Sequence, residues 1–344
     1  MLHQIFNKQG SLVFIAEIGL NHNGIFEVAE EMIRQAHSCG ADGVKFQTFV
    51  PENMYSRYAS SLIATGDEKE PSTKEQDFFA SLTFTREELL ELHSIAASLN
   101  IEFFSTPFDE ESVELLQSIG VRLFKVASSE VTNHVLLRAI AKTGKPVIMS
   151  TGLSTEKEIE MALKCLSSNG TPEVVLLHCV SLYPLPYDAA NLSRITALRN
   201  RFNCEVGFSD HSADYKTVEI AVALGAGFIE KHFTLSDDFD CPDRSVSLSP
   251  EKFNEMIQAA NGVRILLGNG NIDFSSAEKD VAKSARRSLF AKRDISKGTI
   301  ITQSDIVPKR PGTGIPIYME HEVIGKRSLI DIKKDYMIRM EHIE

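Results

Sequence analysis

The sequence predicts an α/β protein, a closed (β/α)8 TIM barrel followed by a small C-terminal domain rich in β-structure. Short apolar runs with β-branched or aromatic residues alternate with helical patterns from the N-terminus to about residue 268, as in repeated βα units around a parallel sheet. There are eight such runs, and nearly every one ends beside a charged or hydroxylated side chain. Eight successive units favour a closed barrel over an open, doubly wound sheet. The polar strand ends favour it further, because in a barrel they converge on one face, whereas in an open sheet they lie along a line.

The expected elements follow one another in a regular order. Strands are expected at residues 12–18, 43–47, 101–105, 122–126, 146–150, 173–178, 205–208 and 228–231. The clearest helices are expected at residues 26–38, 86–99, 156–167 and 250–267. The polar residues at the strand ends are Glu17, Lys45, Thr106, Lys125 with Ser128, Ser150, His178, Ser209 with His211, and Lys231 with His232. One longer gap, residues 48–85, is rich in Pro, Ser, Tyr and charged residues and is expected to form a loop at the active site.

The helical and strand periodicity ends near residue 268, where Gly, Asn and Ser become frequent. We therefore predict a barrel domain over residues 1–270, a linker over 271–282 and a small domain over 283–344, which carries short alternating runs. From residue 283 onward there are 13 Lys and Arg against 8 Asp and Glu, compared with 23 against 39 in the rest of the chain. The two parts therefore have oppositely charged surfaces. A domain of about 60 residues has a small core and is expected to dock on another surface.

Composition argues against several classes of protein. The net charge of −11 disfavours nucleic acid as a partner, because phosphate backbones require an excess of Lys and Arg. No window approaches the roughly 18 uncharged apolar residues of a membrane span, and the N-terminal residues lack a secretion signal, so we expect a cytoplasmic protein. The five cysteines are scattered and contain no Cys-x-x-Cys pair, so neither a disulfide framework nor a zinc site is expected.

Two histidines, His211 and His232, follow neighbouring strands seven and eight of the predicted barrel. Adjacent strand ends place both imidazoles within reach of one divalent metal ion, whose remaining positions would stay open for water and substrate. No third protein ligand is evident from the spacing. A pair of hydrogen-bonded rim histidines without a metal is therefore the alternative at this point.

Lys45 and Lys125 each end a strand, and they concentrate positive charge in an otherwise acidic domain. Hydroxyl groups around the same rim come from Thr106, Ser128, Ser150 and Ser209. This set suits a ligand that carries a phosphate and a carboxylate, which together need several donors from different directions. In the alternative, each lysine pairs with Glu17, Glu130 or Glu230, and each serine only caps the next helix.

Glu17 follows a wholly apolar run, so its carboxylate is expected at the barrel mouth, where a general base would be useful. Asp243 is its candidate partner. It lies in the polar loop after strand eight, where an aspartate in a solvated turn is the alternative.

Nine short segments occur in the order in which one known family carries them. They are residues 16–24 (AEIGLNHNG), 44–49 (VKFQTF), 104–109 (FSTPFD), 125–130 (KVASSE), 150–153 (STGL), 178–184 (HCVSLYP), 207–212 (GFSDHS), 229–233 (IEKHF) and 310–314 (RPGTG). In these segments the chain resembles the sialic acid synthase family over nearly its full length. That family comprises N-acetylneuraminate synthase and its legionaminic, pseudaminic and spore-coat relatives.

The resemblance implies a fold and a reaction. The barrel would carry a C-terminal domain similar to type III antifreeze proteins, called a SAF domain, and two chains would exchange these domains in a homodimer. The reaction would condense phosphoenolpyruvate with N-acetylmannosamine or a related N-acyl hexosamine and water, giving a nonulosonic acid and phosphate. It would depend on a divalent ion bound by His211 and His232, with Mn2+ expected first and Mg2+ or Co2+ as alternatives.

The resemblance also implies roles for individual residues. The positions for binding phosphoenolpyruvate are Lys45, Thr106, Lys125, Ser128, Ser150 and Ser209. The positions facing the amino sugar are Gln47, Tyr183, Asp243 and, from the partner chain, Arg310. Glu17 would be the catalytic base that deprotonates an attacking water, with Asp243 as the second catalytic residue.

Two departures from the family pattern leave the identity of the sugar open. The chain has Cys241-Pro242-Asp243-Arg244 where the family commonly has Gly-Pro-Asp-His, and Ser181 where some N-acetylneuraminate synthases have Asn. The alternatives are a legionaminic or pseudaminic acid synthase that uses a 2,4-diacetamido hexose, or a spore-coat polysaccharide synthase. A 3-deoxy-sugar-acid synthase would have no reason to carry the SAF domain. A carbohydrate-binding protein with an inactive barrel would not need the intact polar rim.

Overall fold

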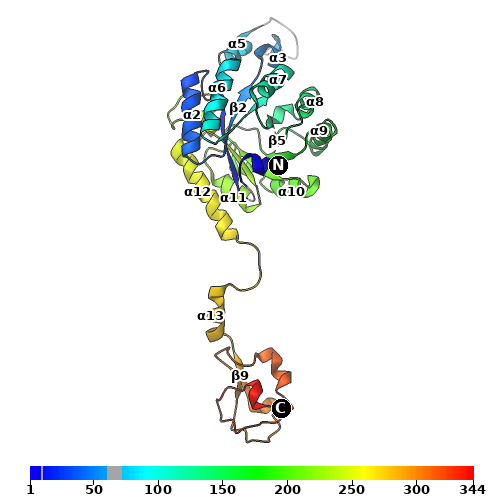
Figure 1. Cartoon of the computed structure of the whole chain (residues 1–344), viewed down its shortest axis with the longest axis vertical. Coiled ribbons are helices and arrows are strands. Elements are labelled where there is room, and N and C mark those ends of the chain that lie inside the picture. The colour runs from blue at the N-terminus through cyan, green and yellow to red at the C-terminus, as the bar shows by residue number, and fades with distance from the viewer. Residues whose placement is uncertain (9–10, 60–71) are drawn as a thin grey trace. The chain divides into compact units, whose positions relative to one another are not determined.

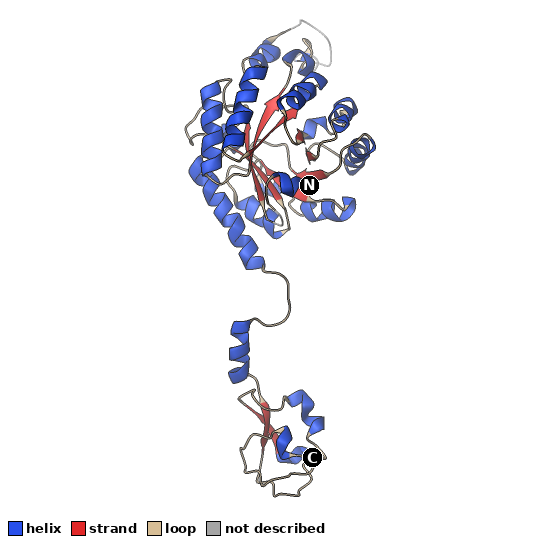
Figure 2. Cartoon of the chain, viewed as in Figure 1, coloured by secondary structure: helices blue, strands red, loops and turns tan. Residues whose placement is uncertain are grey.

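Eight parallel strands form the sheet of the first unit (Figures 1 and 2). The computed structural model describes residues 1–8, 11–59 and 72–344, and the chain divides into two units, Met1–Leu267 and Gly268–Glu344. The strands are β1 (Val13–Gly19), β2 (Gly43–Thr48), β3 (Glu102–Pro107), β4 (Phe124–Val126), β5 (Val147–Ser150), β6 (Val174–His178), β7 (Val206–Asp210) and β8 (Phe228–His232). They are hydrogen-bonded in the order β3-β2-β1-β8-β7-β6-β5-β4, and the end strands β3 and β4 pack against each other. The predicted barrel is confirmed in a nearly closed form, with each strand within two residues of its expected bounds.

Helices surround these strands, as Figure 2 shows in blue. They are α2 (Phe26–Ser38), α6 (Arg86–Ser98), α7 (Glu110–Ile119), α8 (His134–Lys142), α9 (Glu156–Ser168), α10 (Arg194–Phe202), α11 (Lys216–Ala223) and α12 (Pro250–Leu267). The four helices predicted from periodicity lie within one residue of their expected bounds. Helices α6 and α9 begin at capping boxes in which Thr85 and Thr155 each exchange hydrogen bonds with a glutamate three residues later. Over the described part of the chain, no helix combines the length and the apolar character that crossing a membrane requires.

The barrel interior changes from apolar to polar along the strands. Side chains of a strand alternate between its two faces, so Val13, Ile15 and Glu17 of β1 all point into the barrel. The deep layer is apolar and is closed by Leu2 of α1 (Leu2–Ile5) and by Phe6. Its members are Leu2, Phe6, Val13, Ile15, Phe104, Leu123, Ile148, Val175, Leu177 and Phe228. The next inward positions are polar, so the polar side chains lie at the carboxyl ends of the strands, above this apolar layer.

The described part of the segment between β2 and α6 contains two short helices, α3 (Pro51–Met54) and α5 (Lys74–Ala80). Phe79 of α5 packs edge-on against Phe49 at a ring distance of 5.4 Å, within a small apolar cluster that also contains Leu20 and Leu82. The predicted active-site loop falls partly on residues 60–71, which lie outside the described residues. None of the described residues 50–59 and 72–84 lines the barrel cavity described below.

The second unit has its own small core around a two-stranded antiparallel sheet. The sheet pairs β9 (Ser288–Ala291) with β10 (Ile306–Lys309), and isolated bridges such as Ile300 to Arg327 extend the pairing. Three short 3-10 helices, η4 (Gln303–Asp305), η5 (Ile317–Glu322) and η6 (Met340–His342), complete the unit. Helix α13 (Ser276–Ala285) precedes the sheet and begins at a capping box between Ser275 and Glu278. This helix overlaps the segment predicted as a linker, and its capping box was a sequence signal that the prediction did not use.

Candidate active site

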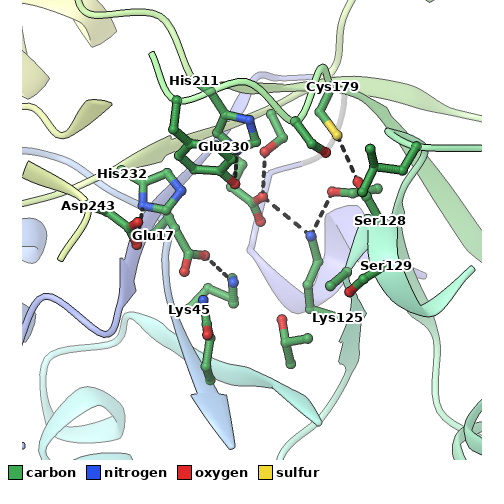
Figure 3. Close-up of a pocket in the computed structure, with 18 of the residues that line it drawn as sticks. Glu17, Lys45, Lys125, Ser128, Ser129, Cys179, His211, Glu230, His232 and Asp243 are labelled. Atoms are coloured by element: carbon green, nitrogen blue, oxygen red, sulfur yellow. Dashed lines mark hydrogen bonds and ion pairs between the residues drawn. The ribbon is translucent and has the colours of Figure 1, made fainter. Parts of the chain in front are cut away.

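A cavity of about 310 Å³ opens at the carboxyl ends of the barrel strands, and Figure 3 shows the side chains that converge on it. Every strand, or the residues directly after it, contributes a side chain to the wall. Twelve of the thirteen residues predicted for the site line this cavity. They are Glu17, Lys45, Gln47, Thr106, Lys125, Ser128, Ser150, Tyr183, Ser209, His211, His232 and Asp243. The thirteenth, Arg310, belongs to the second unit.

Glu17 and Lys45 form the first ion pair of the cavity. They are register partners on β1 and β2, and the Lys45 ammonium contacts the Glu17 carboxylate (Figure 3). Both are buried, with only 1% and 5% of their surface exposed. Burial lowers the pKa of Lys45 to about 7, although nearby Glu230 opposes this shift. The charge on Lys45 therefore depends on the anions around it, which suits a binding site for an anionic ligand.

Lys125 forms the second ion pair and connects three strands. Its ammonium donates to Ser150 Oγ at 2.7 Å and lies 3.4 Å from Glu230 Oε1, which also accepts a hydrogen bond from Ser209 Oγ at 2.8 Å. Burial alone would raise the pKa of Glu230, but Lys125 and Lys45 outweigh burial and hold its pKa well below the ordinary value. Glu230 is therefore ionised, and it holds two of the predicted ligand-binding side chains, Lys125 and Ser209, at the cavity wall.

His211 and His232 lie side by side above these ion pairs, with ring centroids 5.4 Å apart. His211 Nδ1 donates to the Val180 carbonyl at 2.9 Å. In the neutral ring Nε2 is therefore the acceptor, and Nε2 lies 3.0 Å from the Tyr183 hydroxyl. Burial lowers the pKa of His211 to about 4, which keeps the ring neutral. On the other side, His232 Nδ1 lies 3.3 Å from Asp243 Oδ2.

This group fits a divalent cation chemically. Neutral imidazole nitrogens and a carboxylate are ligands that transition metals accept, and the buried His232 Nδ1 makes no hydrogen bond of good geometry with Asp243 despite the 3.3 Å separation. Within those residues no group of three or more His, Cys, Asp or Glu side chains has the geometry to hold a metal by itself. An ion at His211 and His232 would therefore draw its other ligands from water and substrate, as expected for a catalytic rather than a structural site.

Unpaired polar atoms are concentrated in the cavity. Within the described residues, six have a buried side-chain nitrogen or oxygen without a hydrogen-bond partner, and four of the six, Glu17, Thr106, Glu230 and His232, line the cavity. Glu17 and Glu230 are still in ion pairs with lysines, and His232 Nδ1 lies 3.3 Å from Asp243, so Thr106 is the one of the four without such a contact. Buried polar atoms are normally paired, since leaving one unpaired costs about 1–3 kcal/mol. The arrangement indicates a cavity built to receive a polar ligand.

Two polar residues counted at the strand ends, His178 and Lys231, do not line the cavity. His178 Nε2 bonds to the Ala190 carbonyl at 2.8 Å, and Lys231 is fully buried against Asp210. Both occupy strand positions one residue away from an inward-facing side chain, so the pleat turns them toward the surrounding helices. Counting polar residues at the strand ends without regard to this alternation produced the error.

The structure also adds cavity residues that the sequence analysis did not assign to the site. Glu230 appeared there only as a possible partner for a lysine, although it stands two residues before His232 and therefore faces the same way. Cys179 accepts a hydrogen bond from the Gly152 amide at 3.2 Å and lies 3.0 Å from Ser128 Oγ, so it braces the loop that carries Ser128 (Figure 3). Burial raises the pKa of this thiol, which keeps it protonated. The remaining additions are Phe108, Ala127, Ser129, Leu153 and Ser181.

The first unit is a nearly closed (β/α)8 barrel with buried lysines, hydroxyls and two histidines at its strand ends, and a small β-domain follows it in the chain. These features are typical of barrel enzymes that act on anionic substrates. The chain belongs to the NeuB family: the model of that family matches residues 32–272, and the SAF domain model matches residues 286–344. The predicted relationship to sialic acid synthases and the predicted SAF domain are thereby confirmed.

Named relatives cover nearly the whole chain. The N,N'-diacetyllegionaminic acid synthase of Campylobacter jejuni is 38% identical over 95% of this chain and 98% of its own length. The N-acetylneuraminate-9-phosphate synthase of Mus musculus is 32% identical over 96% of this chain and 92% of its own length. Among solved structures, the N-acetylneuraminic acid synthetase of Leptospira borgpetersenii has a TM-score of 0.71 at 33% identity, covering 79% of this chain and 90% of that one.

Proposed function

We propose that the protein is a transferase that condenses phosphoenolpyruvate with an N-acyl hexosamine and water, giving a nonulosonic acid and phosphate. One observation carries the proposal: two buried lysines, a ring of hydroxyls and two histidines beside a carboxylate line a single cavity. Lysines and hydroxyls suit a trianionic ligand, and the imidazoles with Asp243 suit a cation that activates a carbonyl. The matches to named synthases over nearly the full chain support the same reaction class.

Phosphoenolpyruvate would lie against the wall formed by β4, β5 and β7. Lys125 and Ser150 already form a hydrogen-bonded pair there, and Ser128 and Ser209 offer hydroxyls beside them. Lys45 would bind from the opposite wall, where an anion would raise its lowered pKa and restore its full charge. Thr106 Oγ1, which has no hydrogen-bond partner in the described structure, would donate to the same ligand.

The amino sugar would lie above, against Gln47, Tyr183 and Asp243. A divalent ion held by His211 and His232, with Mn2+ proposed first and Mg2+ or Co2+ as alternatives, would polarise the aldehyde oxygen of the open-chain sugar. The Tyr183 hydroxyl keeps its proton because burial raises its pKa, so it remains a hydrogen-bond donor next to His211.

The protein's own carboxylates account for the remaining steps. When C3 of phosphoenolpyruvate attacks the aldehyde carbon, the aldehyde oxygen takes up a proton and positive charge develops at C2, where Glu17 and Glu230 stabilise it. Glu17 then accepts a proton from the water that adds to C2. The C–O bond to phosphate then breaks, and the proton of the C2 hydroxyl passes to the departing phosphate, which leaves a carbonyl at C2. The proton on Glu17 returns to solvent and balances the one that the aldehyde oxygen took up from solvent.

The described rim of the cavity favours an unphosphorylated sugar. Its outer residues are Phe108, Ser129, Leu153, Ser181 and Tyr183, which carry no charge, together with the anionic Asp243. A sugar 6-phosphate would find no cation among these side chains, whereas an acyl methyl group would contact apolar ones. We place N-acetylmannosamine first. A 2,4-diacetamido hexose is the second candidate, because the N,N'-diacetyllegionaminic acid synthase of Campylobacter jejuni shares 38% identity with this chain.

The catalytic unit would be a cytoplasmic homodimer that exchanges its SAF domains, so that Arg310 of one chain reaches the sugar bound by the other. The loop that carries Arg310 is firmly held within its own unit. The Ser288 hydroxyl donates to the Pro311 carbonyl at 2.8 Å and accepts from the Gly314 amide at 2.8 Å. A rigid loop suits a residue that must enter a neighbouring site.

The decisive assay measures phosphate release from phosphoenolpyruvate with N-acetylmannosamine, its 6-phosphate and the 2,4-diacetamido hexoses, each with and without Mn2+. We expect release only when both an N-acyl hexosamine and the metal are present. Lys125→Met, which removes a cavity cation, should abolish it. Absence of release with every sugar would refute the proposal and favour a carbohydrate-binding protein.

A further inference from the structure

A third ion pair, between Lys231 and Asp210, lies on the outer side of the strands that carry the two histidines. The two residues are register partners on β8 and β7, and both side chains are completely buried. Lys231 Nζ lies 2.8 Å from Asp210 Oδ2. Because side chains alternate along a strand, this pair faces the helices, while His211 and His232, each one residue further along, face the cavity.

The pair includes the residue before His211 and is hydrogen-bonded to the backbone of the residue after it, Ser212. Asp210 Oδ1 accepts from the Ser212 amide at 2.9 Å, and Asp210 Oδ2 accepts from the Ser212 hydroxyl at 2.9 Å. Lys231 also donates to the Ser212 carbonyl. Ser212 Oγ in turn lies 3.1 Å from Thr217 Oγ1 in the first turn of α11.

The hydrogen bonds of this pair lie beyond the end of β7, where ladder hydrogen bonds to the neighbouring strands no longer fix the backbone. Strand β7 ends at Asp210, so His211 lies just beyond the last ladder pair, whereas His232 is still the final residue of β8. Lys231 connects the two segments: it precedes His232 in the chain and bonds to both neighbours of His211. The separation of the two imidazoles therefore depends on this pair as well as on the strands.

Stability alone does not account for a fully buried ion pair. Replacing both partners of such a pair with apolar residues of similar volume is often neutral or stabilising, because the cost of desolvating two charges is removed. What the charged pair adds is a fixed geometry for its hydrogen-bonded neighbours. In metal sites, outer groups that hydrogen-bond to the ligating side chains typically alter metal affinity by about 10–100-fold; this pair would act on the same geometry through the backbone that flanks His211.

We propose that Lys231 and Asp210 are positioning residues that set the spacing of His211 and His232 and thereby the affinity of the site for a divalent cation. The inference rests on the proposed metal-dependent function. It adds a pair of residues that touch neither substrate nor cation.

The test is the double variant Asp210→Leu/Lys231→Met in the full-length protein. Mn2+ is titrated calorimetrically into chelator-treated protein, and thermal unfolding of the metal-free protein is recorded in parallel. We expect an unfolding temperature close to that of the wild type and a Kd for Mn2+ weakened by about tenfold or more. At saturating Mn2+, turnover should return to near the wild-type value, a recovery that a damaged barrel would not show.

A matched control is available at the other end of the barrel. Glu102 and Arg122 form an ion pair at the start of β3 and just before β4, and Glu102→Gln/Arg122→Met should leave the Kd for Mn2+ unchanged. If the double variant does not fold, the nearly isosteric Asp210→Asn carries the same expectation of weaker Mn2+ binding.

An unchanged Kd in a folded double variant would overturn the inference and leave the proposed function intact. An equal loss in the control pair would also overturn it, because the effect would then be general. Failure of the wild type to bind Mn2+, or unchanged binding in His211→Ala, would overturn the metal site of the proposed function and this inference with it.

Discussion

Replacing Glu17 with glutamine tests the proposed general base most directly. The side chain keeps its shape and loses one negative charge at a position with only 1% of its surface exposed. A positioned general base contributes about 10²–10⁴ to the rate, which corresponds to about 3–5 kcal/mol of barrier. We therefore expect kcat to fall by about 10²–10⁴ in Glu17→Gln.

Binding of phosphoenolpyruvate should survive the same substitution. Lys45 loses its direct partner, but Glu230 and Asp243 remain near it and hold its pKa up. A further fall of one unit in the pKa of Lys45 would weaken anion binding by about tenfold. A fall in kcat larger than the rise in KM is the signature of an interaction made in the transition state.

The assay follows phosphate release at saturating metal and sugar while phosphoenolpyruvate is varied. Glu102→Gln is the matched control, since it makes the same change in another buried carboxylate at the opposite end of the barrel. Turnover of Glu17→Gln within a few fold of the wild type would refute the role of Glu17 as a base. A change confined to KM would show that Glu17 serves only to orient Lys45.

Three further predictions concern charge, metal and partner chain. Burial lowers the pKa of Lys45 to about 7, so its cationic form prevails below that pH and is lost above it. KM for phosphoenolpyruvate should therefore rise about tenfold per pH unit above about pH 7. A KM that does not change across that range would contradict this prediction. Chelation should abolish phosphate release, and Mn2+ should restore it in the wild type but not in His211→Ala at the same concentration; equal recovery would exclude His211 as a ligand. Arg310→Ala should raise KM for the sugar by about 10–100-fold, as expected for a lost charge-assisted hydrogen bond, and should leave KM for phosphoenolpyruvate unchanged. Mixing Arg310→Ala chains with Glu17→Gln chains should restore activity only if the SAF domains are exchanged, because one barrel of the mixed dimer then has both Glu17 and Arg310.

Most of the barrel was predictable because its signals are local. Each strand is a short apolar run and each clear helix shows a 3.6-residue period, so eight strands could be located to within two residues. The meeting of the predicted residues at one place was predictable for a related reason, since a barrel brings all its strand ends to one face whatever their separation in the chain. Twelve of the thirteen predicted residues line one cavity on that rule.

One further distinction was within reach of the sequence and was missed. A two-residue alternation places Glu230 with His232 inside the barrel and Lys231 outside it, and the structure has this arrangement. Position along the strand alone puts Lys231 on the polar rim, whereas the face to which its side chain points puts it among the helices.

The sequence by itself determined the order of elements, the barrel and the set of side chains at its mouth, because hydrophobic periodicity and position along a strand are properties of neighbouring residues. Only the tertiary structure decided the pairings: Lys45 with Glu17, Lys125 with Glu230, and Lys231 with Asp210. Closure of the barrel sets β1 beside β8, so that Glu17 becomes the register partner of His232. These distances decide which acidic side chain pairs with which lysine and which polar atoms remain available to a ligand. No local sequence pattern encodes such distances.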